Sequence, residues 1–237
     1  MQYCRYRMAG DLAEGRSVLE IGCGSGMGLP YLKERASRVV GGEYTPRLLA
    51  EARAHVPDVE LDRIDAQDLP YPDEAFDVVL MLEMIYYLPD VERAFGECHR
   101  VLKPGGTLFV CIPNRDRPDF NPSPHAYAYP NAPELAGLFE RQGFGVRILG
   151  GFPIDQETDR DRFLRPLRQL AIRLHLIPRS MRMKALVKTL LYGRLPRLDR
   201  VTEGMAHYPP PQPLDPVQPT AAYKNLYAIG TKQTIGA

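Results

Sequence analysis

The sequence is poor in cysteine and contains no long apolar run. Four of its 237 residues are cysteines, and no two of them form a C-x-x-C pair, so the spacing supports neither a disulfide framework nor a metal site. Free thiols fit a reducing cytoplasm. The most apolar stretch, residues 78–85, is short and carries Glu83, so it cannot span a bilayer. The first residues lack an apolar signal segment, and we therefore expect a cytoplasmic protein.

The sequence also has almost no excess of one charge, with 30 Lys and Arg against 29 Asp and Glu. This balance argues against a protein that binds polyanions over its whole surface, but it hides an uneven distribution. Residues 160–200 contain twelve basic and two acidic side chains, a net charge of +10, so the rest of the chain carries −9. Residues 208–219 then hold six prolines, which predicts an extended connection.

Apolar runs and amphipathic stretches alternate along the remainder of the chain. Together they predict an α/β fold with a doubly wound sheet. The predicted strands are residues 17–21, 38–43, 59–65, 76–82, 107–112, 144–149 and 223–231, and the predicted helices are residues 28–35, 47–55, 91–102 and 131–142. The nearly continuous apolar character of residues 76–82 indicates a strand that is buried on both faces. Thr45 and Pro46 predict a helix start, with the Thr45 hydroxyl as its cap.

Four alternating glycines follow the first predicted strand, in the run Glu20-Ile-Gly-Cys-Gly-Ser-Gly-Met-Gly. Glycines at such a turn let the chain bend sharply and let a ligand approach the backbone. The dinucleotide-binding fingerprint G-x-G-x-x-G/A does not fit, because its last position falls on Met27 or Leu29.

The pattern instead resembles motif I of class I S-adenosylmethionine-dependent methyltransferases, of the methyltransferase domain 11 type that acts on small molecules. Three further stretches resemble later motifs of that family, in the same order: VVGGEYTPRLLAEAR, DAQDLPYPDEAFDVVLMLEMIYYLPD and RVLKPGGTLFVCIPN. The resemblance implies a seven-stranded Rossmann-like sheet of order 3-2-1-4-5-7-6 with the last strand antiparallel. It also implies S-adenosyl-L-methionine as cofactor.

The resemblance assigns cofactor contacts to particular positions. Gly22, Gly24 and Gly26 would leave room for the methionine part, and Glu43 would accept hydrogen bonds from the ribose hydroxyls. Asp65 would accept from the adenine amino group, with Asp68 as a rival. The complete set of expected cofactor residues is Glu20, Gly22, Cys23, Gly24, Gly26, Glu43, Tyr44, Asp65, Ala66, Gln67, Leu82 and Glu83. Glu20 would lie under the glycine turn, near the amino group of the cofactor or orienting the loop, or would be an ordinary buried acid.

The catalytic candidates follow the fourth and fifth predicted strands and are Glu83, Tyr86, Tyr87 and His125. Tyr86 and Tyr87 occupy positions where the family often has two histidines, so this chain departs from the pattern there. They would stack on or bond an acceptor, or pack in the core and rim. His125 is the best single candidate for a general base, although a lone histidine in a loop is more often structural or exposed.

The resemblance and the charge distribution divide the chain into three parts. Residues 1–158 and 220–237 form the predicted methyltransferase domain, residues 159–205 a basic helical insertion between strands six and seven, and residues 206–219 the proline-rich connection. Two amphipathic helices are predicted in the insertion. Four interpretations stay open: a lid over the substrate cleft, a site for an anionic acceptor, contact with an anionic membrane surface, or non-specific contact with nucleic acid, which is the least favoured.

The predicted function is transfer of a methyl group to a small-molecule acceptor, with anionic sugars, lipid-linked compounds and natural-product intermediates as the candidates. The alternative is a catalytically silent scaffold that binds the cofactor or a partner. The expected location is cytoplasmic or peripheral at the membrane. The sequence leaves the oligomeric state open.

Overall fold

The computed structural model describes residues 1–156 and 200–233, in which strands and helices alternate as the sequence pattern predicts. The elements in chain order are α1 (Gln2–Ala13), β1 (Ser17–Ile21), α2 (Leu29–Lys33), β2 (Arg38–Glu43), α3 (Pro46–His55), β3 (Glu60–Arg63), β4 (Phe76–Leu82), the 3-10 turn η1 (Ile85–Tyr87), α4 (Val91–Val101), β5 (Leu102–Pro113), α5 (Ala132–Arg141), β6 (Phe144–Pro153), the 3-10 turn η2 (Ile154–Gln156), β7 (Gln212–Pro213) and β8 (Tyr223–Lys232).

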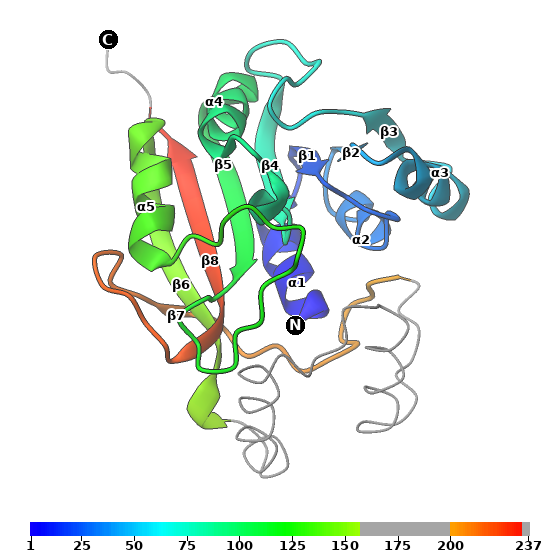
Figure 1. Ribbon diagram of the computed structural model, residues 1–237. Helices are drawn as coiled ribbons and strands as arrows, with labels where there is room; N and C mark the ends of the chain where they lie inside the picture. The colour runs from blue at the N-terminus through cyan, green and yellow to red at the C-terminus, as the bar shows by residue number, and fades with distance from the viewer. Residues whose placement is uncertain (157–199, 234–237) are drawn as a thin grey trace.

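The strands of the described residues form one sheet of order β3-β2-β1-β4-β5-β8-β6-β7 (Figure 1). The first five are parallel, and β8 runs antiparallel to both β5 and β6. The predicted order and the antiparallel last strand are therefore confirmed. The predicted count of seven strands is wrong, because β7 adds an eighth strand beside β6. It comes from the proline-rich connection and lies at the sheet edge, where residues without an N–H are tolerated.

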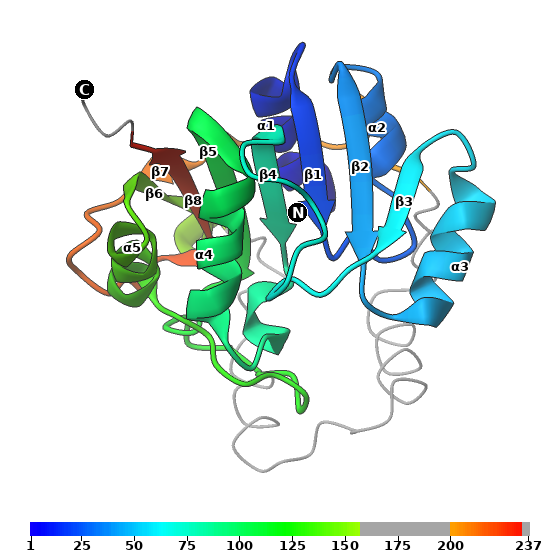
Figure 2. The same cartoon turned by 90° about the horizontal axis from the view of Figure 1, so that it is seen from above.

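Helices cover both faces of the sheet, which confirms the doubly wound arrangement (Figure 2). α4 and α5 lie on one face, and α1 and α2 lie on the other. The strand β4 shows how the two halves of the core arise. Val79 and Met81 enter the apolar cluster on one side, whereas Val78 and Leu80 enter the cluster on the other. Burial on both faces explains why the sequence of this strand is continuously apolar.

The helix α1 is absent from the sequence prediction. It buries Tyr3, Tyr6, Ala9 and Ala13, which are spaced three or four residues apart and therefore share one face. Small and tyrosyl side chains make this stripe weakly apolar, so it does not stand out as a periodic pattern. A second local difference concerns α3: Thr45 precedes the helix as expected, but its hydroxyl makes no capping hydrogen bond.

The predicted insertion, residues 159–205, and both helices predicted in it fall almost entirely outside the described residues, which resume at Arg200. From there the chain lies against α1 and α2. The Val201 N–H donates to the Met27 carbonyl at 3.0 Å. The Glu203 carboxylate accepts from the Tyr3 and Tyr31 hydroxyls at 2.5 and 2.6 Å.

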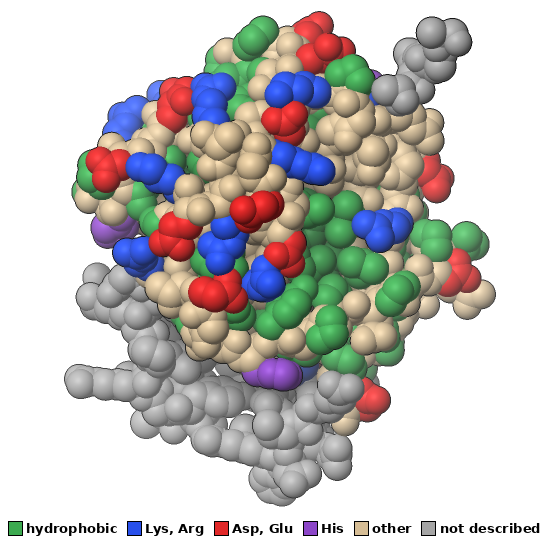
Figure 3. Space-filling view, turned by 180° about the vertical axis from the view of Figure 1, so that it is seen from behind, with side chains coloured by type: hydrophobic (Ala, Val, Ile, Leu, Met, Phe, Trp, Pro, Cys, Tyr) green, Lys and Arg blue, Asp and Glu red, His purple; other side chains and the backbone are tan. Residues whose placement is uncertain are grey.

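The face that carries α1 and α2 has a mixed charge. Acidic and basic side chains lie side by side there, and apolar side chains gather next to them (Figure 3). Ion pairs account for part of the mixture: the Glu203 carboxylate lies 2.7 Å from the Arg35 guanidinium, and Glu34 lies 3.2 Å from Arg200. No helix among the described residues is both long and apolar enough to cross a membrane.

Candidate functional site

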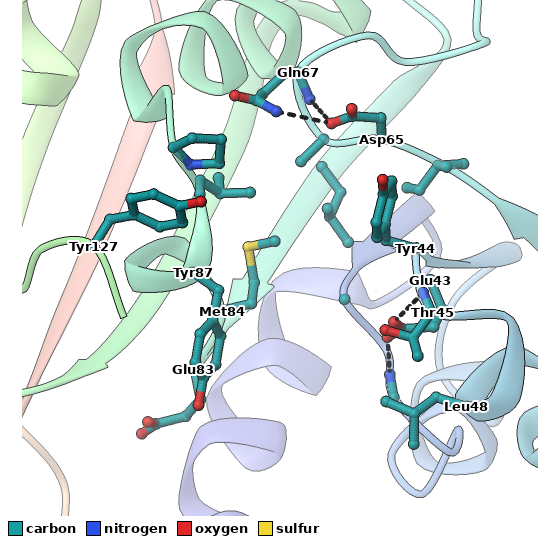
Figure 4. A pocket seen from close by; sticks show the side chains of 17 residues that line it. Glu43, Tyr44, Thr45, Leu48, Asp65, Gln67, Glu83, Met84, Tyr87 and Tyr127 are labelled. Atoms are coloured by element: carbon teal, nitrogen blue, oxygen red, sulfur yellow. Dashed lines mark hydrogen bonds between the residues drawn. The ribbon is translucent and has the colours of Figure 1, made fainter. Parts of the chain in front are cut away.

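A cavity of about 570 Å³ opens at the carboxyl ends of β1, β2 and β4 (Figure 4). The strand order reverses between β1 and β4, and open α/β sheets bind their ligands at such a point. The cavity is lined by Ile21, Gly22, Gly24, Glu43, Tyr44, Thr45, Leu48, Ile64, Asp65, Ala66, Gln67, Glu83, Met84, Tyr87, Leu88, Pro89 and Tyr127. Figure 4 shows Asp65 and Gln67 at one end of the cavity and Glu83 at the other.

The glycine turn forms the floor of the cavity. Gly22, Gly24 and Gly26 have φ angles of +75°, +59° and +79°, in the left-handed region that favours glycine. A Cβ on Gly24 would meet no atom within 4 Å, so this backbone is open to a ligand. Gly26 does not line the cavity, since its missing Cβ would lie 3.0 Å from Val56. The buried Cys23 also lies off the wall.

Glu43 ends β2 and presents its carboxylate at the cavity wall. One oxygen accepts from the Gly24 N–H at 3.0 Å, and the other accepts from the Thr45 N–H at 2.8 Å. These two backbone donors fix the orientation of the side chain, which is buried. Each carboxylate oxygen still has a second lone pair for a ligand hydroxyl.

Asp65, Ala66 and Gln67 form the opposite end of the wall. One Asp65 carboxylate oxygen accepts from the Gln67 backbone N–H at 2.9 Å and from its side-chain amide at 3.2 Å. None of the described residues donates a hydrogen bond to the second oxygen of Asp65, so this oxygen can accept from a donor such as an adenine amino group. The rival candidate Asp68 does not line the cavity.

Glu20 lies beneath the glycine turn rather than on the cavity wall. Its side chain is 1% exposed, and one oxygen accepts from the Tyr6 hydroxyl at 2.5 Å. Among the described residues, no donor reaches its other oxygen. Burial raises the pKa of Glu20 to about 7, although the Tyr6 hydrogen bond and the charge of Arg5 act in the opposite direction. Among the described residues, the hydrogen bond of the Glu20 side chain therefore links β1 to α1.

Glu83 follows β4 directly and has a φ of +60°, a strained value for a residue with a side chain. Its Oε1 lies 3.3 Å from Arg5 Nη1 and accepts from the Asn225 amide at 3.0 Å. Its Oε2 accepts from the Tyr86 hydroxyl at 3.1 Å. Burial raises the pKa of this carboxyl, against the opposing effects of Arg5 and Tyr86. The preceding residue, Leu82, is buried and does not reach the cavity.

The structure separates the other three predicted catalytic candidates, Tyr86, Tyr87 and His125. Tyr86 is buried, and its ring stacks on Tyr129 with centroids 4.5 Å apart. Tyr87 is half exposed and lines the cavity. His125 is exposed and does not line it, whereas Tyr127, two residues further along the same loop, does.

Several residues of the wall were missed by the sequence analysis. They are Ile21, Thr45, Leu48, Ile64, Met84, Leu88, Pro89 and Tyr127. Most of them are direct neighbours in the sequence of a predicted site residue, and this proximity was the one feature that could have pointed to them. Apolar residues look alike in the sequence whether they line a cavity or pack in the core. Only the folded chain shows which of them line the cavity.

A glycine turn after β1 and an acid at the end of β2 also occur in dinucleotide-binding folds. The antiparallel β8 between β5 and β6 gives the strand order that the resemblance to class I methyltransferases implies. Comparison with known families agrees: residues 19–110 match the family model described as "Methyltransferase domain". This stretch is a class I S-adenosylmethionine-dependent methyltransferase domain, which confirms the resemblance drawn from the motifs.

The curated relatives are methyltransferases by name. The chain is 38% identical over 154 residues to a "Probable S-adenosylmethionine-dependent methyltransferase" of Mycolicibacterium smegmatis, covering 62% of this chain and 59% of the relative. It is 36% identical over 104 residues to a phosphatidylethanolamine N-methyltransferase of Cereibacter sphaeroides (41% and 51% covered). It is 35% identical over 132 residues to a ubiquinone biosynthesis O-methyltransferase of Pseudomonas syringae (54% and 55%). The matches thus span little more than half of these relatives.

A solved structure supports the fold alone. A methyltransferase of Thermotoga maritima, described as a "possible histamine N-methyltransferase", superposes with a TM-score of 0.64 at 20% identity, covering 98% of this chain and 89% of that one. The family to which these proteins belong implies S-adenosyl-L-methionine as the cofactor.

Proposed function

We propose that this protein transfers a methyl group from S-adenosyl-L-methionine to a small-molecule acceptor. One arrangement carries the proposal. The Glu43 carboxylate is held by the backbone N–H groups of Gly24 and Thr45, and no atom lies within 4 Å of the place where a Cβ of Gly24 would be. Both residues line the cavity of about 570 Å³ at the point where the strand order reverses. The cavity lies within the size range of small-molecule sites.

The walls fit the cofactor part by part. Glu43 would accept from the two ribose hydroxyls, Asp65 would accept from the adenine amino group, and Gly22 and Gly24 would leave room for the methionine part. When bound, the cofactor supplies an activated methyl group on a sulfonium. The chain would promote the transfer mainly by aligning the acceptor and excluding water.

Calorimetry with S-adenosylhomocysteine tests the premise. We expect binding, and we expect Glu43→Gln to weaken it by roughly 10- to 150-fold, because hydrogen bonds to a charged group contribute about 1.5–3 kcal/mol. The matched control is Glu140→Gln, on the exposed side of α5, which should bind as the wild type does. Absence of binding up to about 1 mM would refute the proposed function, and an unchanged Glu43→Gln affinity would refute the placement of the ribose.

The acceptor is proposed to be apolar or aromatic, of the lipid-related kind. Tyr87 and Tyr127 are large side chains on the surface, 45% and 69% exposed, and both line the same cavity with Met84. Aromatic side chains left exposed at a pocket mouth are available to stack on a ligand. The names of two relatives, which include a phospholipid and a quinone, point in the same direction.

Contact with an anionic membrane surface through residues 160–200 is a further part of the proposal. It rests on their net charge of +10, since these residues lie almost entirely outside the described part of the chain. Liposome flotation should show binding to vesicles with acidic lipids and none to neutral vesicles. Replacing the basic residues of 179–188 by glutamine should abolish the binding. Equal binding to both vesicle types would contradict the prediction.

A further inference from the structure

The carboxylate of Glu83 is built into the acceptor end of the cavity by elements from distant parts of the chain. Arg5 comes from α1, Tyr86 from η1, Cys111 from β5 and Asn225 from β8. The four groups approach the carboxylate, with the Cys111 thiol at 3.7 Å from Oε1. Contacts from four separate elements hold Glu83 in place, and these contacts explain why its strained backbone conformation persists.

The donors around Glu83 fix its position without using up its acceptor capacity. Oε1 faces Arg5, Cys111 and Asn225, whereas Oε2 accepts from the Tyr86 hydroxyl. A carboxylate has about four lone-pair sites, so Oε2 retains one. The side chain is 22% exposed and lines the cavity, so this site is accessible to a ligand.

The other ionisable groups of the cavity wall have different tasks. Glu43 is held by two backbone N–H groups at the end proposed for the ribose. Asp65 lies at the far end with Gln67. Tyr86 is buried and does not line the cavity, and it stays protonated because burial raises its pKa well above 10. Among the described residues of the wall there is no histidine.

We propose that Glu83 takes the proton from a hydroxyl group of the acceptor, so that the protein is an O-methyltransferase. The inference rests on the proposed function and specifies its substrate class. As the hydroxyl oxygen forms its bond to the methyl carbon, the carbon–sulfur bond of the sulfonium breaks and its electron pair stays on sulfur. The hydroxyl proton passes to Glu83 Oε2, which later releases it to water.

Arg5, Tyr86 and Asn225 are positioning residues in this scheme, because they act through Glu83. The charged group Arg117, in the loop after β5, also contributes a positive potential there. Cys111, Tyr129 and Tyr227 are further titratable neighbours, and burial keeps all three protonated. Raising the pKa of Glu83 by burial makes it a stronger base than an exposed carboxylate.

The test uses the full chain and tritium transfer from methyl-labelled S-adenosylmethionine. Catechol is the hydroxyl probe and ethylamine is the amine probe, both at millimolar concentration. We expect transfer to catechol, with a rate that rises with pH through the pKa of Glu83. Glu83→Gln should lower kcat by roughly 10²- to 10⁴-fold, the usual contribution of a general base. The control Glu140→Gln, on the exposed side of α5, should change neither kcat nor the affinity for S-adenosylhomocysteine.

The positioning residues are tested by the pH profile, which a merely structural role would not move. Asn225→Asp replaces a donor 3.0 Å from Glu83 by a second carboxyl, and Tyr86→Phe removes a donor to the charged form. Both changes should move the inflection of kcat to higher pH, the first by about one unit or more.

The outcomes separate the two proposals. Absence of S-adenosylhomocysteine binding refutes the proposed function. If the cofactor product binds, the assignment of Glu83 is overturned by transfer to ethylamine alone, by transfer to neither probe, or by a Glu83→Gln variant that keeps the wild-type rate. Transfer to catechol that depends on Glu83 and follows the shifted pH profiles supports it.

Discussion

Glu20 offers the sharpest physical test of the structure, because its environment disfavours its own charge. The side chain is 1% exposed, and its pKa is raised by burial to about 7. In the unfolded chain this carboxyl would titrate near 4.5. Between these values the folded protein binds more protons than the unfolded chain, so the free energy of unfolding falls as pH rises.

The size of the effect follows from the difference of about 2.5 pKa units. Each unit corresponds to about 1.4 kcal/mol, so Glu20 costs the folded state about 3 kcal/mol above pH 7 compared with pH below 4.5. Glu20→Gln removes the charge but keeps an oxygen that accepts from the Tyr6 hydroxyl. The variant should therefore match the wild type at acid pH and be more stable by up to about 3 kcal/mol at alkaline pH.

Thermal unfolding of wild type and variant at about pH 5.5, 7 and 8.5 measures this difference, since other titrations cancel between the two proteins. At 2–4 °C for each kcal/mol, Glu20→Gln should raise Tm by roughly 6–12 °C at the highest pH. A difference in Tm that is the same at all three pH values would refute the reasoning, because Glu20 would then not titrate between its folded and unfolded pKa.

Two further substitutions test the packing of α1 and the pairing of β1 with β4. Gly28→Ala would place a Cβ 1.9 Å from the Tyr6 ring, so it should lower the free energy of unfolding by about 1–3 kcal/mol, as measured by urea denaturation. Burial alone would raise the pKa of Asp77, but hydrogen bonds from Ser17 and Lys103 lower it to about 2. Asp77→Asn should therefore be less stable than the wild type at neutral pH, and the gap in unfolding free energy should close as pH falls from 4 towards 2.

Gly96 supplies the control for Gly28. It lies within α4, and a Cβ there would meet nothing closer than 3.4 Å. Gly96→Ala should be neutral or stabilising, since alanine favours helices by about 1 kcal/mol over glycine. If Gly28→Ala leaves the free energy of unfolding as little changed as Gly96→Ala does, the Tyr6 ring of α1 does not pack against Gly28. If the difference in unfolding free energy between Asp77→Asn and the wild type does not depend on pH, Asp77 is not held in its charged form by Ser17 and Lys103.

Local sequence was sufficient for most of the sheet and for the wall of the cavity that carries Gly22, Gly24, Glu43 and Asp65. The strand at residues 76–82 was predicted with its observed bounds, because burial on both faces leaves a continuous apolar run. Gly22, Gly24, Glu43 and Asp65 were placed by motif order, and the structure brings all four to one cavity wall. Strand ends of a parallel sheet meet at one edge, so residues that directly follow strands are predictable neighbours.

The end of the cavity that holds Glu83, Tyr87 and Tyr127 was not predictable in the same way. His125 was the favoured base, yet it is exposed and off the wall, whereas Tyr127 in the same loop lines the cavity. The path of a loop depends on what it packs against, which its own residues do not encode. The helix α1 escaped notice for a related reason: its stripe of tyrosine and alanine becomes a buried face only beside α2 and β4.

The sequence by itself determined the alternation of strands and helices, the glycine turn, and the acids within β1 and at the end of β2. These features depend on side-chain period and backbone sterics within a few residues. Only the tertiary structure decided what surrounds Glu83. Its amide donor Asn225 lies 142 residues away, and Arg5 reaches it from a helix that the sequence pattern did not reveal. The charge and proton affinity of a buried carboxyl are set by such distant groups, since burial removes the solvent that would otherwise screen them.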